Sequence, residues 1–302
     1  MLRRTLLASA GAMALTGAAF AADLRAPPPV FLPPPPIYTW TGLYAGINAG
    51  YTWGNNSVTT TSGPETINFG AISPLGVAHA TAAAAGADSV ISTNNSGFIG
   101  GGQIGYNFQF YNSWVVGIEA DIQGSTSRGS GQVFNVTTGA GFPAFPDQTS
   151  ISAADHLDYL GTVRGRLGFT ITPTLLVYGT GGLAYGGLSS STSISGAEVP
   201  ASGPNNGFWV SNGSISNSHV GWTAGGGLEW MFMPNWSAKV EYLYYDLSSL
   251  TYSAGTLSQT FPGGVPFWSF SPSASTHFRG NIVRAGLNYH FNLLPPPIVA
   301  KY

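Results

Sequence analysis

The stretch at residues 236–247, WSAKVEYLYYDL, decides the fold class. Apolar side chains occupy every second position from Trp236 to Tyr244, and Lys239, Glu241 and Tyr245 alternate with them. Because successive side chains of a β-strand point to opposite faces, this period of two predicts a strand with one apolar and one charged face. A strand of about 9 to 11 residues can cross a bilayer at a tilt, whereas soluble strands average about five or six. The stretch is therefore typical of a membrane-spanning strand.

The same alternation recurs along the chain and is separated by connections of two kinds. The predicted strands are residues 40–53, 97–110, 114–124, 156–171, 175–187, 219–232, 236–247 and 278–291. Tight turns are predicted at 111–113, 172–174 and 233–235, and long loops rich in Ser, Thr, Gly and Asn at 54–96, 125–155, 188–218 and 248–277. This pattern predicts an all-β fold, an eight-stranded antiparallel transmembrane β-barrel with short periplasmic turns and long extracellular loops.

Most charges of the predicted strands lie on the face opposite the apolar residues. In a closed barrel this face lines the lumen, and closure is required because an open sheet edge cannot be satisfied in lipid. A soluble β-sandwich would also alternate, but it would not need strands this long or charges sorted by face. The predicted lumen charges are Glu119, Asp121, Asp158, Arg164, Arg166, Glu229, Lys239, Glu241 and Arg284.

Neighbouring strands predict two clusters among these charges. Glu119 and Asp121 can reach Arg164 or Arg166, and a second cluster joins Glu229, Lys239, Glu241 and Arg284. An eight-stranded barrel is just wide enough for side chains to fill its interior. We therefore favour a salt-bridged plug. A narrow water or ion path is the alternative, and a proton relay or catalytic acid pair is a third, less favoured reading.

The composition narrows the possible functions. Only 7% of residues are charged and the formal net charge is −2, so nothing suggests a nucleic-acid partner. The absence of cysteine excludes disulfides, thiol catalysis and cysteine metal sites. No mature stretch offers about 18 consecutive apolar residues, as a membrane helix would require.

The two ends of the chain differ from the barrel in composition. Arg3 and Arg4 precede an apolar run that closes on Ala19-Phe20-Ala21, which predicts a secretory signal peptide at 1–21 and export through the periplasm to the outer membrane of a Gram-negative bacterium. Residues 22–39 are predicted to be a Pro-rich periplasmic linker, 40–291 the barrel and 292–302 a C-terminal tail.

Aromatic residues near the strand ends predict two girdles at the membrane interfaces. The girdle residues are Trp40, Trp53, Trp114, Phe169, Trp222, Trp236, Tyr244 and Phe291. The two-level pattern is the evidence, because any single aromatic residue is also an ordinary strand former.

Nothing in the sequence marks a cofactor, a metal site or a catalytic residue. No HExxH or comparable ligand spacing is present. His156, His219 and His277 fall near outer strand ends and could converge at the barrel mouth as a haem or metal site, but we favour ordinary polar rim histidines. A lipid hydrolase or acyltransferase would need a nucleophile, a histidine base and an acid on one rim, and no such group is marked. We therefore predict that the protein is not an enzyme.

Five segments resemble the outer-membrane immunogenic-protein type of β-barrel common in alphaproteobacteria. They are YTWTGLYAG at 38–46, TGGLAYG at 180–186, GWTAGGGLE at 221–229, KVEYLYYD at 239–246 and RAGLNYHF at 284–291. The resemblance is clear in these five strands, looser in the other three and absent from the predicted long loops. It implies an abundant, surface-exposed, immunogenic barrel that supports envelope integrity, and some members are described as small porins or haem binders. It supplies no catalytic residues.

We thus expect a structural, surface-exposed outer-membrane protein with a charged plug, with a small low-conductance porin as the alternative and haem binding less favoured. The expected partners are outer-membrane lipid and lipopolysaccharide, the barrel assembly machinery, and either a second copy of the chain or a periplasmic partner. Many such barrels end on an aromatic residue read during assembly, whereas here Phe291 is followed by 292–302. Either Phe291 is read internally or Tyr302 serves.

Overall fold

The computed structural model describes residues 38–63, 65–67, 74–141, 143, 146–199, 207–260 and 266–291. They belong to one compact unit, Tyr38–Tyr302. The predicted signal peptide at 1–21 and tail at 292–302 lie outside the described residues, as does the predicted linker apart from Tyr38 and Thr39. Among the described residues, no helix is both long enough and apolar enough to span a bilayer.

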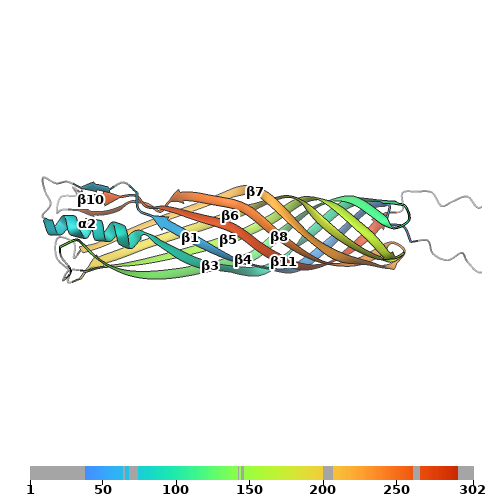
Figure 1. The fold of residues 1–302 in the computed structure, drawn as a ribbon, viewed down its shortest axis with the longest axis horizontal. Coiled ribbons are helices and arrows are strands. Elements are labelled where there is room, and N and C mark those ends of the chain that lie inside the picture. Colours follow the sequence, from blue (N-terminus) through green and yellow to red (C-terminus); the bar gives the residue numbers. More distant parts are fainter. Residues whose placement is uncertain are drawn as a thin grey trace, which may run out of the picture. The chain divides into compact units, whose positions relative to one another are not determined.

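Eight strands close into an antiparallel barrel in the order β1-β11-β8-β7-β6-β5-β4-β3, which confirms the predicted fold class (Figure 1). The strands are β1 (Gly42–Thr61), β3 (Ser89–Phe110), β4 (Trp114–Thr138), β5 (Pro146–Thr172), β6 (Leu175–Glu198), β7 (Phe208–Met233), β8 (Trp236–Ser253) and β11 (Ser273–Phe291). Closure comes from pairing of the first strand with the last, where Leu43 lies opposite Phe291.

The strands begin at the predicted tight turns but run further than predicted at their other ends. β4 continues to Thr138 and β5 starts at Pro146, so most of the loop predicted at 125–155 is strand, and so is most of the one at 188–218. In these parts the alternation persists with small side chains, because buried Ile151 and Ala153 alternate with Ser150 and Ser152. These segments were predicted to be loops because they are rich in serine and glycine, and the alternation of small apolar residues within them was overlooked.

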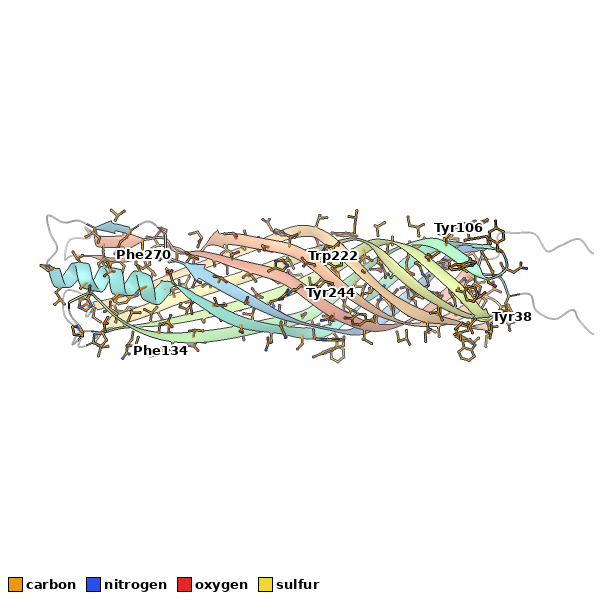
Figure 2. All side chains as sticks on the ribbon, in the orientation of Figure 1. Tyr38, Tyr106, Phe134, Trp222, Tyr244 and Phe270 are labelled. Carbon is orange, nitrogen blue, oxygen red and sulfur yellow. The ribbon has the colours of Figure 1, made fainter. Side chains whose placement is uncertain are left out.

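The outer face of the wall changes from mainly apolar to mainly polar partway along the strands, although Val90, Phe134, Val136, Phe208 and Val210 are exposed beyond the change. Near the turns it carries exposed aliphatic and aromatic residues, as a lipid-facing band requires. The change occurs between Trp53 and Asn55 on β1, and between Tyr244 and Asp246 on β8. Figure 2 shows Trp222 and Tyr244 between the turn end, marked by Tyr106, and the opposite end, marked by Phe134. We take this change as the outer edge of the membrane-spanning part.

Beyond this edge two seams of the barrel open. The ladder between β3 and β4 stops at Ser96 and Arg128, and the ladder between β7 and β8 stops at Trp222 and Asp246. The ladders of β4 with β5, β5 with β6 and β6 with β7 continue, as do those of β1 with β3 and β11. The wall therefore divides into two four-stranded sheets, which we call the head together with the elements that cover them.

A helix and a small sheet cover the head. The sheet has the order β2 (Glu65–Ile67), β10 (Pro266–Phe270), β9 (Leu257–Thr260). The Ala-rich helix α2 (Pro74–Ala87) is anchored by side chains of the barrel strands, because Thr60 Oγ1 donates to Ala87 O and Asn135 Nδ2 donates to Gly86 O. The core between the sheets and their cover includes Val58, Ile91, Ile151, Ile194, Trp209, Trp268 and Phe270.

One titratable pair joins α2 to the sheet beneath it, outside the membrane-spanning part. His79 Nδ1 lies 2.6 Å from Asp147 Oδ1, and both side chains are buried. Burial raises the pKa of the Asp147 carboxyl from its ordinary 3.8 to about 6, because desolvation outweighs the hydrogen bond and the charge of His79. The folded head therefore takes up a proton at this carboxyl more readily than the unfolded chain does.

This shift predicts that the packing of α2 on the barrel strands is more stable at low pH than at high pH. The stabilisation from the raised pKa is complete below about pH 4 and is lost as the pH rises through about 6. Amide exchange, corrected for its intrinsic pH dependence, should show α2 opening more easily at about pH 8 than at about pH 5. Asp147→Asn should remove the difference, and Asp88→Asn, at an exposed carboxyl just after α2, should keep it. Equal pH dependence in Asp147→Asn and the unaltered protein would contradict the assignment.

The position of the head can be tested by labelling, because the natural chain has no cysteine. In intact cells, Ser152→Cys should react with a membrane-impermeant maleimide, since this side chain is exposed on the head. Leu183→Cys should not react because its position lies in the lipid-facing band. Asn112→Cys should not react because the tight turns are predicted to lie in the periplasm. Reaction of the turn variant with no reaction of the head variant would reverse the topology.

Candidate functional site

The barrel wall brings charged side chains together by simple register. Directly opposite each other on neighbouring strands lie Glu119 and Arg164, Glu229 and Lys239, and Glu241 and Arg284. Opposite charges in facing positions attract, and the alternation of the strands turns all of them inward. The network that they form with Asp121 and Arg166 is called the lumen network below.

Longer contacts cross the lumen and join strands that are not neighbours. Arg164 of β5 lies 3.0 Å from Glu241 of β8, and Lys239 of β8 lies 2.9 Å from Glu119 of β4. Two further bridges are Arg284 to Asp121 at 2.9 Å and Arg166 to Glu229 at 2.6 Å. The structure therefore holds one continuous network, where the sequence predicted two clusters.

The lumen network is buried and balanced in charge. Its four carboxylates and four cationic groups are all at most 5% exposed. Burying a charge costs several kcal/mol unless partners compensate it. Two tyrosines add to the compensation, because Tyr44 Oη donates to Glu119 Oε2 and Tyr178 Oη donates to Glu241 Oε1. The Arg166 guanidinium also lies 3.9 Å from the centre of the Tyr178 ring. Neither tyrosine was predicted from the sequence to belong to the network, although Tyr44 alternates with the apolar residues of its strand.

Apolar layers fill the interior on both sides of the lumen network. On the turn side a cluster contains Trp40, Val115, Leu176, Tyr178 and Met231. On the other side a larger cluster contains Ile99, Leu157, Leu160, Leu188, Leu243, Leu247, Phe278 and Ile282. A buried carboxylate, Asp155, follows and accepts hydrogen bonds from Thr93 and Ser190, before the core of the head begins. Charged and apolar layers thus succeed one another along the barrel.

The prediction that Asp158 belongs to the lumen charges is wrong. A β-bulge lies between Leu157 and Tyr159, which pair with the consecutive residues Leu188 and Gly187. The bulge leaves Asp158 as the extra residue and shifts the alternation by one position. Asp158 is exposed and accepts a hydrogen bond from Ser189 Oγ.

Trp40 is also misplaced by the sequence prediction. Strand β1 begins only at Gly42, so Trp40 precedes the wall and lies inside the turn end of the barrel, 1% exposed. Its Nε1 donates to Pro173 O at 3.1 Å, and its backbone N donates to Gln109 Oε1 at 3.2 Å. Trp40 is therefore part of the interior packing and does not face lipid.

The other predicted girdle residues lie on the outer face and are at least partly exposed. They are Trp53, Trp114, Phe169, Trp222, Trp236, Tyr244 and Phe291. Several pair with aromatic neighbours, with ring centres 5.4 Å apart for Trp114 and Phe169, and 5.3 Å for Trp222 and Tyr244. Such placement suits amphipathic rings at a membrane interface.

The three histidines considered for a haem or metal site each have different neighbours. His277 Nε2 lies 3.0 Å from Asp246 Oδ2, and His156 faces Arg128 across the β4–β5 ladder. His219 lies opposite Gly186 of β6. Within the described ranges, no three His, Asp or Glu side chains form a group that could hold a metal ion.

The chain is similar to known outer-membrane proteins. Residues 7–291 match the family model described as outer membrane protein beta-barrel domain. The chain is 36% identical over 248 residues to the 31 kDa outer-membrane immunogenic protein of Brucella melitensis, covering 82% of this chain and 88% of that protein. It is 29% identical over 164 residues to the 22 kDa outer membrane protein of Rhizobium leguminosarum, covering 51% and 59%. The outer membrane protein OprG of Pseudomonas aeruginosa shows 12% identity and a TM-score of 0.35, with 84% and 98% covered.

The lumen network predicts a large penalty for removing one charge. Arg164→Met leaves three buried carboxylates short of a partner and should lower the free energy of unfolding by about 3 to 5 kcal/mol. Replacing Arg164 and Glu119 together by apolar residues should cost less than the sum of the two single changes. Urea titration of the refolded barrel measures both, with Arg128→Met on the outer face as control. Strict additivity, or a loss no larger than in the control, would indicate a hydrated lumen.

Proposed function

This chain belongs to the outer-membrane β-barrel family and resides in the outer membrane, and we propose that it acts there as a closed structural barrel. In this proposal the lumen network seals the membrane-spanning part and the head is presented outside the cell. The barrel then contributes to envelope integrity and to contacts at the cell surface. It binds membrane lipid through its apolar band and reaches the membrane through the barrel assembly machinery.

The observation that carries the proposal is the filling of the lumen. Every charge of the lumen network has an opposite charge within 4.0 Å, across neighbouring strands and across the lumen. An ion that crossed the barrel would have to break these contacts and then pass the apolar cluster around Leu160 and Leu243. Each step is costly in a medium of low dielectric constant.

A second observation supports a role outside the membrane. The head is built from the same strands as the membrane-spanning part, and its core contains large residues such as Trp209 and Trp268. Because the strands are continuous, the head follows directly on the lipid-facing band. Such a platform suits a protein that presents surface to partners better than one that carries solutes.

Conductance decides between a closed barrel and a small porin. The refolded mature protein should insert into planar bilayers and show no steady single-channel current above that of detergent alone. A porin of known conductance serves as the positive control for insertion and detection. A stable ohmic current abolished by heat denaturation would overturn the closed-barrel proposal and favour the low-conductance porin.

A further inference from the structure

One part of the outer wall, over β4 to β7, carries three chemically distinct zones in succession. Within the membrane-spanning part, Ile122, Val163 and Leu183 are exposed and apolar. At the edge of this band the outer face carries Arg128 and His156. Immediately beyond, it is lined by hydroxyl, amide and glycine groups. The zones follow one another along the same strands, so a single ligand that lies along the wall can contact all three.

The middle zone is open and carries an arginine and a histidine. Arg128 and His156 face each other directly across the β4–β5 ladder, and both side chains project outward. Within the described part of the chain, no carboxylate lies within 4 Å of Arg128, whereas four of the other five arginines and lysines of that part are in the lumen network. The exposed carboxylate of Asp158 belongs to the same zone, since its Oδ2 accepts from Ser189, which lies opposite His156. Arg128 is therefore the group left to hold a phosphate. An exposed guanidinium at a membrane edge is a strong donor to phosphate oxygens.

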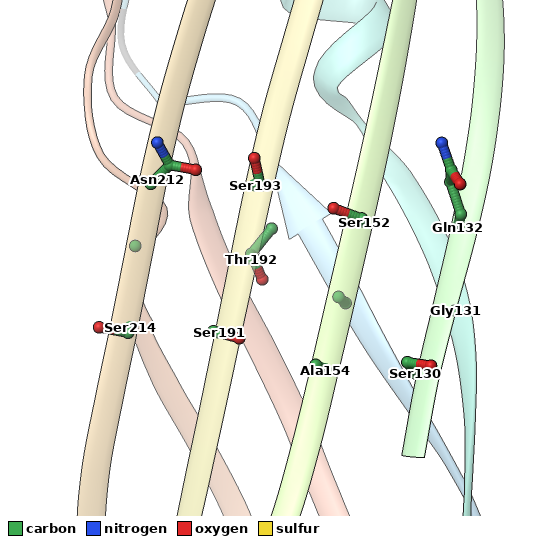
Figure 3. Close-up of a pocket in the computed structure, with 12 residues that line it drawn as sticks. Ser130, Gly131, Gln132, Ser152, Ala154, Ser191, Thr192, Ser193, Asn212 and Ser214 are labelled. Carbon is green, nitrogen blue, oxygen red and sulfur yellow. The ribbon is translucent and has the colours of Figure 1, made fainter.

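The third zone is a shallow groove of about 600 Å³. It starts two residues beyond the basic pair, at Ser130 and Ala154, and it crosses all four strands (Figure 3). The polar groups around it come from Ser130, Gln132, Ser152, Ser191, Asn212 and Ser214. Within the described residues, the hydroxyls of Ser152, Ser191 and Ser214 have no hydrogen-bond partner, so they are free to bind a polyhydroxylated ligand.

We propose that this face of the barrel binds a phosphorylated glycolipid of the outer leaflet. Its acyl chains would lie on the apolar band, its phosphate on Arg128 and His156, and its sugars in the groove. The order of the three zones selects this ligand, because only a lipid held in the membrane presents acyl chain, phosphate and sugar in that order. The proposal adds a ligand to the structural role and stands even if the barrel conducts.

Binding can be measured on the mature, refolded protein in detergent micelles with fluorescently labelled lipopolysaccharide. Arg128→Gln should weaken binding about tenfold, as expected when a charge-assisted hydrogen bond is lost. Arg279→Gln removes the other outward-facing arginine, on β11, and should leave the affinity unchanged. Equal losses in both variants would show unspecific attraction of charge and overturn the proposal.

The groove needs its own test, with folding checked by heat-modified electrophoretic mobility. Ser152→Trp should fill the groove and weaken binding of lipopolysaccharide that has its core sugars, but not of a form stripped of them. Thr59→Trp, at an exposed position on β1 of the head, should change neither. Unchanged binding of the full glycolipid by the Ser152→Trp protein would remove the sugar contact. Binding of inorganic phosphate alone, with the same dependence on Arg128, would reduce the site to a small-anion site.

Discussion

Arg164 contacts three carboxylates at once, those of Glu119, Asp121 and Glu241, at 2.5 to 3.0 Å. A guanidinium can satisfy several acceptors because its donors lie in a fixed planar fork. The three carboxylates come from β4 and β8, so this one side chain ties opposite parts of the wall together. Because these groups are at most 5% exposed, neither the acids nor the bases can be buried alone without a large cost. The charge balance of the lumen network is therefore a condition for closing the barrel around it.

Glycines in the barrel wall make room for the two tyrosines of the lumen. Tyr44 and Tyr178 must lie flat inside the barrel to donate to the acids, and glycines stand where their rings pass. A Cβ at Gly105 would come within 2.4 Å of the Tyr44 ring, and one at Gly227 within 2.8 Å of Tyr178 Oη. Any larger residue at these positions would push the tyrosines away from Glu119 and Glu241. At these two positions the placement of the tyrosine side chains requires glycine.

Local alternation and turn spacing were enough to predict eight strands and the tight turns, and eight of the nine charges predicted to face inward do so. They could not predict contacts across the lumen, such as Lys239 to Glu119, because these depend on closure of the whole barrel. The bulge that turns Asp158 outward cannot be recognised in the sequence, because the residues on both sides of Asp158 are apolar. The head was missed because strands there carry serine on the outside and small apolar residues inside. Trp40 was placed wrongly because an aromatic residue near a strand end is typical of a girdle, whereas Trp40 precedes the first residue of β1.

Proton exchange at the arginine side chains tests most directly whether the lumen is dry. In the refolded barrel, arginine labelled with ¹⁵N gives Nε–H signals whose exchange with water is measured by nuclear magnetic resonance. Arg164 and Arg284 donate through Nε to Thr162 and Glu241 and are buried, so their signals should persist when the pH is raised. The exposed Arg128 and Arg279 should lose theirs to exchange and act as internal controls. Equally fast exchange at all four arginines would show that water reaches the lumen network and would contradict the closed barrel.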